Sequence, residues 1–154
     1  MNSYFVCNNC SLNLQEITKD FSKDHFFKIQ QDHYFGDSEI FNSRLMNKIE
    51  AEDNKIKLNM IHKYLGNSSK ILEIGPGSGS FAKLIEDLQF NITLVEESSA
   101  LSKNLVRIIK GKVVNKNISE YKTDERYDAV CAFQVIEHVI DLNQHLKDIK
   151  NLLK

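Results

Sequence analysis

The feature that most constrains this chain is a short apolar run that stops at a glycine-rich loop, in residues 70–79 (Lys-Ile-Leu-Glu-Ile-Gly-Pro-Gly-Ser-Gly). After the loop, apolar residues return at helical spacing over residues 80–88. A strand, a glycine turn and a helix in this order are typical of a nucleotide-binding βα unit, because glycine accepts positive φ and lets a ligand approach the backbone. A tight turn that binds nothing is the alternative.

Composition places the chain among ordinary globular proteins. Its 154 residues suffice for one domain with a buried core, and 42% are hydrophobic and 27% charged. A net charge of −1 gives no electrostatic reason to expect nucleic acid or a membrane surface as a partner. No apolar run approaches the about 18 residues of a membrane span, and the three cysteines form no disulfide framework. We therefore expect a cytoplasmic protein.

The first 43 residues read as an N-terminal extension in which Cys7 and Cys10 are spaced like one knuckle of a zinc ribbon. A structural zinc ion needs four ligands, and no second cysteine pair exists. His25 and His33 lie further apart than the usual histidine pair. We therefore favour a surface turn with two free thiols and predict no bound metal, with a zinc site completed by other residues as the alternative. The aromatic residues of this extension are expected to pack against the main domain.

Residues 44–154 are predicted to form a single domain. An amphipathic helix is expected over residues 44–65, with Ile49, Ile56, Met60 and Ile61 on its apolar face. Apolar strands then alternate with helical patterns, which predicts an α/β fold, a Rossmann-like doubly wound parallel sheet of at least four strands. The strands are expected at residues 70–74, 92–95, 113–117 and 127–133, and the helices at 80–88, 98–109 and 142–153.

Ligands of such sheets bind beyond the carboxyl ends of the strands, beside the first strand. Glu96 follows the second strand, 21 residues after Gly75, which is about the separation at which an acidic side chain takes ribose hydroxyls. Asn117 offers an amide that can pair with an adenine edge, and Ile118 offers an apolar contact for the ring. Together these residues predict a nucleoside site.

The spacing of the glycines narrows the choice of nucleoside. A dinucleotide site typically has the pattern Gly-x-Gly-x-x-Gly. Here Ser80 occupies the sixth position of that pattern, and the third glycine, Gly79, comes one residue early. Glu73 would repel a pyrophosphate and suits a ligand with an ammonium group. No Gly-Lys-Ser/Thr follows, so a Walker-type loop is excluded. A nicotinamide-dependent oxidoreductase is disfavoured but stays open.

The pattern Glu-x-Gly-x-Gly-x-Gly at residues 73–79 resembles motif I of class I S-adenosylmethionine-dependent methyltransferases. Residues 94–96 resemble the second motif of that family, and residues 127–139 are similar to its fourth-strand motif in the group that includes ubiquinone-biosynthesis O-methyltransferases. The resemblance implies S-adenosyl-L-methionine as cofactor, with the backbone around Phe133 and Gln134 bordering its methionine part. The predicted cofactor-binding residues are Glu73, Gly75, Gly77, Gly79, Glu96, Glu97, Asn117, Ile118, Phe133 and Gln134.

The knuckle and the following Tyr34-Phe35 pair resemble a subgroup associated with sugar or glycan methylation. The resemblance implies O-methylation of a small-molecule or glycan acceptor. An acceptor hydroxyl needs a general base, for which His138 is the candidate, and a structural role of His138 in its loop is the alternative. Some relatives bind a divalent ion through a Glu-x-x-Glu-His run, but Gln134 replaces the first glutamate here.

Members of the family continue with three more strands beyond the fourth. The fourth strand would otherwise be an open apolar edge. We therefore expect either a C-terminally short chain or an edge covered by another segment or a second copy. Three functions follow: a methyltransferase or its cofactor-binding half, a non-catalytic S-adenosylmethionine-binding module, and the disfavoured oxidoreductase.

Overall fold

The computed structural model describes residues 4–6, 13–15, 44–66 and 68–154, with side chains from residue 48 onward. The chain divides into two units, Met1–Asn47 and Lys48–Lys154. In the first unit, β1 (Tyr4–Val6) pairs antiparallel with β2 (Asn13–Gln15). Several positions considered from the sequence lie outside the described residues: Cys7, Cys10, His25, His33, the Tyr34-Phe35 pair and the aromatic residues between positions 16 and 43.

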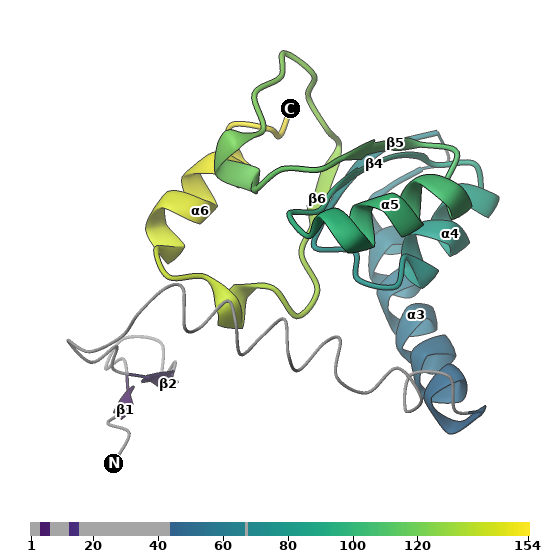
Figure 1. The fold of residues 1–154 in the computed structure, drawn as a ribbon, viewed down its shortest axis with the longest axis horizontal. Helices are drawn as coiled ribbons and strands as arrows, with labels where there is room; N and C mark the ends of the chain where they lie inside the picture. Colours follow the sequence, from purple (N-terminus) through teal and green to yellow (C-terminus); the bar gives the residue numbers. More distant parts are fainter. Residues whose placement is uncertain (1–3, 7–12, 16–43, 67) are drawn as a thin grey trace. The chain divides into compact units, whose positions relative to one another are not determined.

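The second unit is built on a parallel sheet with the strand order β5-β4-β3-β6 (Figure 1). The strands are β3 (Lys70–Ile74), β4 (Asn91–Val95), β5 (Lys112–Val114) and β6 (Ala129–Cys131). Ile71 of β3 lies opposite Ile92 of β4 on one side and Ala129 of β6 on the other. The chain therefore leaves β3 in one direction and returns on its other side, so the switch point lies beside β3. The predicted Rossmann-like parallel sheet is confirmed.

Helices cover both faces of this sheet. They are α3 (Arg44–Tyr64), α4 (Ser80–Asp87), α5 (Ser99–Ile108) and α6 (Leu142–Lys150), with short 3-10 helices η1 (Ile118–Glu120) and η2 (Ile136–His138). One face packs against α3, α4 and α5, in a core that includes Ile61, Ile71, Phe81, Ile85, Ile92, Leu94 and Leu105. The other face packs against η1 and α6, in a core that includes Leu72, Ile74, Val95, Ile118, Tyr121, Tyr127 and Leu152.

The predicted helix before the sheet exists and buries Ile61 of its predicted apolar face, but the prediction that Ile49, Ile56 and Met60 share that buried face was wrong. Ile49, Ile56 and Met60 are 54%, 61% and 57% exposed, whereas Asn54 and Ile61 are buried. A helix buries residues spaced three or four apart, and α3 meets the sheet through Asn54, Ile61 and their neighbours. The buried face of α3 combines apolar Ile61 and Leu58, which pack in the core, with polar side chains that bond to the glycine loop, as described below.

The fourth strand is shorter than residues 127–133. Ala129–Cys131 are in register with β3, and Asp128 before them donates its backbone N–H to the carbonyl of Lys70 at 2.8 Å. Tyr127 forms an isolated parallel bridge with Leu153. Downstream, Gln134 has a φ of 55°, so the extended backbone does not continue through it. The bridge also explains why α6 ends at Lys150 and not near residue 153. Likewise, β5 ends at Val114, and Asn117 caps η1 instead of extending the strand.

A helix that crosses a lipid bilayer has to be both long and apolar. Within the described ranges, none combines the length and the apolar content that crossing a membrane requires. The longest of them, α3 (Arg44–Tyr64), carries charged residues along its length.

Candidate functional site

The glycine loop leaves β3 at the centre of the sheet. Gly75, Gly77 and Gly79 have φ values of 62°, 56° and 79°, which favour glycine. A Cβ atom added to Gly75 would lie 2.8 Å from Cγ2 of Val135, and one added to Gly79 would lie 2.5 Å from Cδ2 of Leu105. At Gly77 the same atom would meet nothing within 4 Å. Two of the glycines therefore permit close packing, and Gly77 opens onto free space.

Glu73 is placed beside this loop by its position near the end of β3. Its side chain is 3% exposed, and Cys131 of β6 is its register partner. Burial raises the pKa of Glu73 to about 7, and the positive charge of Lys57 opposes that rise. The Oε2 atom of Glu73 is buried without a hydrogen-bond partner. Because buried polar atoms are normally hydrogen-bonded, this oxygen is suited to a ligand that brings a donor.

The acidic residues after β4 meet the segment after β5. Glu96 is 6% exposed, and its Oε1 atom accepts a hydrogen bond of 2.7 Å from the backbone N–H of Ser98. Burial, followed by the negative charge of Glu97, raises the pKa of Glu96 even though the Ser98 bond opposes it. Nδ2 of Asn117 donates to Oε2 of Glu97, and Nδ2 of Asn115 donates to the backbone carbonyl of Glu96 at 2.8 Å. The two strand ends are therefore joined.

Asn117 and Ile118 are already engaged within the protein. Oδ1 of Asn117 accepts from the backbone N–H of Ser119 at 3.0 Å and from its hydroxyl at 2.9 Å. Ile118 is 6% exposed and belongs to the core between the sheet and α6. The adenine contacts expected of these two residues stay predictions.

The segment after β6 brings the remaining predicted residues to the same edge of the sheet. The Phe133 ring contacts Phe81 edge to face, with 5.1 Å between the ring centroids. Gln134 is exposed, and His138 lies in η2, where its backbone N–H donates to the carbonyl of Val135 at 2.9 Å. Burial, followed by the negative charge of Glu73, raises the pKa of the Cys131 thiol to about 12, which favours the protonated thiol near neutral pH.

Sequence reasoning missed the contribution of α3 to this site. The hydroxyls of Ser78 and Ser80 each donate a hydrogen bond of 2.6 Å to Oε1 of Glu50. Nδ2 of Asn54 donates to the Ser80 hydroxyl at 2.9 Å, and Lys57 lies one turn further along the helix. The available signal was the spacing of Glu50, Asn54 and Lys57, which places three polar side chains on one helix face.

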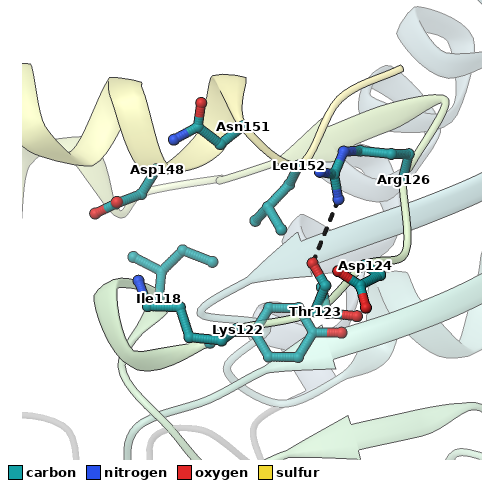
Figure 2. A pocket seen from close by; sticks show the side chains of 9 residues that line it. Ile118, Lys122, Thr123, Asp124, Arg126, Asp148, Asn151 and Leu152 are labelled. Atoms are coloured by element: carbon teal, nitrogen blue, oxygen red, sulfur yellow. Dashed lines mark hydrogen bonds between the residues drawn. The ribbon is translucent and has the colours of Figure 1, made fainter.

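Two hollows of the second unit lie away from this site. The first, of about 410 Å³, lies between the segment before β6 and α6 (Figure 2) and is lined by Ile118, Tyr121, Lys122, Thr123, Asp124, Arg126, Asp148, Asn151 and Leu152. The second, of about 520 Å³, lies near the amino ends of the strands, where Lys70, Asn91 and Lys112 begin them. Ile118 is the one predicted cofactor residue that lines either, so neither is taken as the candidate site.

Residues 46–154 match a protein family described as a methyltransferase domain. The chain belongs to this family. The match begins within α3 and includes the whole parallel sheet, so all the candidate site residues of this methyltransferase domain lie inside it.

Curated relatives of the chain include ubiquinone biosynthesis O-methyltransferases from Rickettsia. The protein from Rickettsia bellii (strain OSU 85-389) is 28% identical over 90 residues, which cover 55% of this chain and 38% of that protein. The protein from Rickettsia typhi is 29% identical over 154 residues, covering 94% of this chain and 58% of that protein. The matched part of this chain therefore spans 38% to 58% of the length of these two relatives.

A solved structure shows the same fold. The N-methyltransferase NodS from Bradyrhizobium japonicum WM9, crystallised in complex with S-adenosyl-L-homocysteine, superposes with a TM-score of 0.64 at 15% sequence identity. The superposition covers 84% of this chain and 67% of NodS. At this identity the likeness supports the fold of the methyltransferase domain alone.

Proposed function

We propose that this chain is the cofactor-binding part of an S-adenosylmethionine-dependent methyltransferase that methylates an oxygen of a small-molecule or sugar acceptor. The observation that carries the proposal is the buried carboxylate of Glu73, whose Oε2 atom has no partner, beside a glycine loop that opens at Gly77. Membership of the methyltransferase domain family supports methyl transfer. The names of the Rickettsia relatives support oxygen as the acceptor atom, and NodS binds S-adenosyl-L-homocysteine on the same fold.

The residues present fit this cofactor. The unpartnered oxygen of Glu73 suits the ammonium group of the methionine part, and the open space at Gly77 admits the cofactor beside the backbone. Glu96 would accept hydrogen bonds from the ribose hydroxyls, because an ionised carboxylate only accepts. The other assigned contacts are the loop glycines Gly75 and Gly79, Glu97 at the ribose, Asn117 and Ile118 at adenine, and Phe133 and Gln134 at the methionine part.

When bound, S-adenosylmethionine supplies an electrophilic methyl group on a positively charged sulfur. The contribution of the chain is then alignment, since holding the reacting groups in place removes most of the entropic cost of their meeting. A hydroxyl acceptor also has to lose its proton, and we assign the imidazole of His138 as the general base that accepts it. His138 lies in η2, after the Phe133 and Gln134 segment that would border the methionine part.

A second candidate function is a cofactor-binding module without catalysis. It is the alternative because the contacts assigned above, apart from His138, all serve the cofactor and none is assigned to an acceptor. Such a module would bind S-adenosylmethionine through the same residues and would depend on another segment for its acceptor site.

Titration calorimetry with S-adenosylmethionine, S-adenosylhomocysteine and NAD tests the cofactor. We expect both sulfur compounds to bind and NAD to bind much more weakly, and tightest binding of NAD would overturn the proposal. Methyl-transfer assays with hydroxylated small molecules and glycans then separate the two candidates, because binding without turnover favours the module. In an active preparation, His138→Ala is expected to slow transfer and leave cofactor affinity intact, whereas unchanged transfer would assign His138 a structural role.

We further propose that another segment or a second copy of the chain covers the outer edge of β6. This strand ends the described sheet, and beside it Tyr127 donates its N–H to the carbonyl of Leu152 at 2.8 Å while Lys154 donates to the carbonyl of Tyr127 at 3.1 Å. Unpaired strand edges attract further strands, so a segment or a second copy is expected there. Sedimentation analysis at several concentrations distinguishes a dimer from a monomer.

We also place the protein in the cytoplasm. Cys131 is a free thiol on β6, which fits a reducing compartment. Fractionation of cells that express the tagged full-length gene product tests this location, and a tag recovered outside the cytoplasmic fraction would contradict it.

A further inference from the structure

Four large hydrophobic side chains of α3 are exposed in the described part of the chain. Ile49, Ile56 and Met60 are each more than half exposed, and Tyr64 is 75% exposed. Their spacing of seven, four and four residues places them along one side of the helix, in a row that we call the outer stripe. Monomeric proteins rarely expose a continuous row of large apolar side chains, so the outer stripe has the character of an interaction surface.

The outer stripe is separate from the face of α3 that meets the glycine loop. Glu50 accepts hydrogen bonds from Ser78 and Ser80, and Asn54 donates one to Ser80. At 3.6 residues per turn, Glu50 and Asn54 lie about a third of a turn around the helix from the outer stripe. A partner seated on the outer stripe therefore leaves the candidate cofactor site open.

The charges along one edge of the outer stripe change sign along the helix. Glu52 lies on this edge beside the first half of the stripe, and Lys63 lies on the same edge eleven residues, or about three turns, further on. Within residues 48–66 and 68–154, Lys63 contacts the Tyr64 ring but forms no ion pair within 4.0 Å. Glu52 pairs with Lys55 of its own helix, and both side chains are largely exposed. Both charges are therefore accessible to a partner.

This pattern is complementary to itself when two copies of α3 lie side by side in opposite directions. Glu52 of each copy then faces Lys63 of the other. In the same arrangement Ile56 lies beside Met60 of the second copy. A parallel pair would instead bring Glu52 toward Asp53 of the second copy, because these two acidic residues lie on opposite edges of the stripe, and like charges repel. The charges therefore favour an antiparallel pair.

We propose that the outer stripe is a homodimer interface, in which α3 of one copy packs antiparallel against α3 of a second copy. Each copy contributes the same surface, so the contact closes with two-fold symmetry and leaves no stripe exposed. A pair of single helices makes a small interface, so the dimer forms only as the protein concentration rises. The inference does not depend on the proposed cofactor, and it uses a surface other than the edge of β6.

Sedimentation equilibrium of the full chain over about 5 to 500 μM tests the interface. The double variant Ile56→Gln/Met60→Gln is compared with Val106→Gln, because Val106 is a 62% exposed apolar residue on another helix, α5. All three replaced side chains are exposed, so each variant should fold, and thermal unfolding checks this. We expect wild type and Val106→Gln to dimerise alike and the double variant to stay monomeric. A monomeric wild type, or a dimer that survives the double variant, would overturn the proposal.

Charge reversal tests the orientation of the pair. Glu52→Lys and Lys63→Glu should each weaken dimerisation about 3- to 10-fold, because like charges then face each other. The combined variant, with both reversals, restores opposite charges and should return the Kd to within about threefold of wild type. In a parallel pair Glu52→Lys would instead strengthen the dimer, since a lysine would face Asp53. That result, or no recovery in the combined variant, would overturn the antiparallel arrangement.

Discussion

The hydroxyl of Ser78 in the glycine loop donates a hydrogen bond of 2.6 Å to Oε1 of Glu50 on α3. Ser80 donates to the same oxygen at the same distance, and Asn54 holds Ser80 from the next turn of the helix. A helix that precedes the sheet in sequence therefore fixes the loop on which the proposed cofactor rests. The position of α3 and the conformation of the loop are coupled through one carboxylate.

Removal of that carboxylate is expected to weaken cofactor binding. In Glu50→Ala, two loop hydroxyls lose their acceptor, so the loop gains conformations that do not bind. We expect affinity for S-adenosylhomocysteine to fall about 3- to 10-fold, which corresponds to about 1 kcal/mol. Calorimetry measures this, with Glu52→Ala as the control because Glu52 pairs only with the exposed Lys55 among the described residues. Equal affinity in the two variants would contradict the coupling.

Alanine substitutions at two loop glycines should affect stability and cofactor binding to different extents. A Cβ at Gly79 would lie 2.5 Å from Leu105 and would take a φ of 79°, so Gly79→Ala is expected to lower the free energy of unfolding by about 2–4 kcal/mol. Gly77→Ala meets no atom and should cost only about 1–2 kcal/mol for its φ of 56°.

Binding should rank the two loop variants in the opposite way. An added methyl group at Gly77 projects into the space assigned to the cofactor, so binding should be lost at ligand concentrations that saturate wild type, and Gly77→Val should block it more completely. Denaturant titrations and calorimetry of the two alanine variants measure both quantities. A Gly77→Ala chain that binds normally would show that the ligand lies elsewhere.

Glu73 gives stability a pH dependence of known sign. Burial raises its pKa from 4.5 to about 7, so between these values the folded chain binds more protons than the unfolded chain does. The free energy of unfolding should therefore fall as pH rises from about 4.5 to 7, by up to about 3 kcal/mol from this group, and stay level above. Glu73→Gln should remove that decline in urea titrations at pH 5 and pH 8, whereas the exposed control Glu52→Gln should keep it. An unchanged decline in Glu73→Gln would assign it to other groups.

The same carboxylate sets the pH dependence of binding, with the opposite trend. An ammonium ligand pairs with ionised Glu73, so affinity should rise as pH increases from 5.5 toward the pKa of about 7. Below the pKa, each lower pH unit should cost up to about tenfold in affinity, since the proton has to leave first. Calorimetry of S-adenosylhomocysteine at pH 5.5, 6.5 and 7.5 measures this, and Glu73→Gln should bind weakly at all three. A flat profile in the wild-type chain would argue against an ammonium contact.

The sheet and its central loop were predictable because their signals are local. The glycines of residues 75–79 reflect a backbone geometry that favours glycine, and the alternation of apolar strands with helices reflects burial of both sheet faces. Both signals can be recognised within short stretches of sequence. The ends of β4 and β5 could be brought together from topology alone, and the bond between Glu97 and Asn117 bears that out. Which side chains hold the cofactor stays a prediction.

The contribution of α3 could not be predicted in the same way. Its sequence offers two faces, one apolar with Ile49, Ile56 and Met60 and one mixed with Glu50 and Asn54, and periodicity favours burial of the first. The structure buries the second, because Glu50 and Asn54 find partners in Ser78 and Ser80, about 30 residues away. The spacing of Glu50, Asn54 and Lys57 marks this face as polar, but a local pattern does not say which distant residues such a face contacts. For the same reason, the contact between Lys57 and the Phe133 ring could not be predicted from the sequence.

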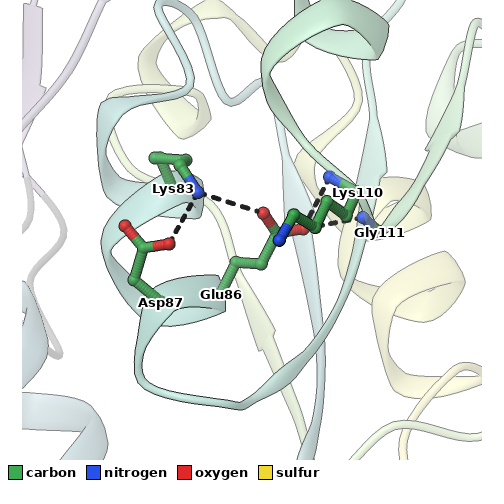
Figure 3. Close-up of polar contacts among 5 residues, drawn as sticks. All are labelled: Lys83, Glu86, Asp87, Lys110 and Gly111. Atoms are coloured by element: carbon green, nitrogen blue, oxygen red, sulfur yellow. Dashed lines mark hydrogen bonds and ion pairs between the residues drawn. The ribbon is translucent and has the colours of Figure 1, made fainter.

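A last prediction concerns the far end of α4, where Glu86 joins two crossovers of the sheet (Figure 3). One oxygen of Glu86 accepts from the backbone N–H groups of both Lys110 and Gly111 at 2.7 Å, while Lys83 bridges Glu86 and Asp87. Glu86→Ala leaves both N–H groups without that acceptor and should lower the free energy of unfolding by about 2–3 kcal/mol. Asp87→Ala should change it by less than about 0.5 kcal/mol, because Asp87 is 62% exposed and contributes a surface ion pair. Urea titrations of the two variants compare the costs directly, and equal destabilisation would mean that the Lys83 ion pairs, not the backbone bonds, hold this corner.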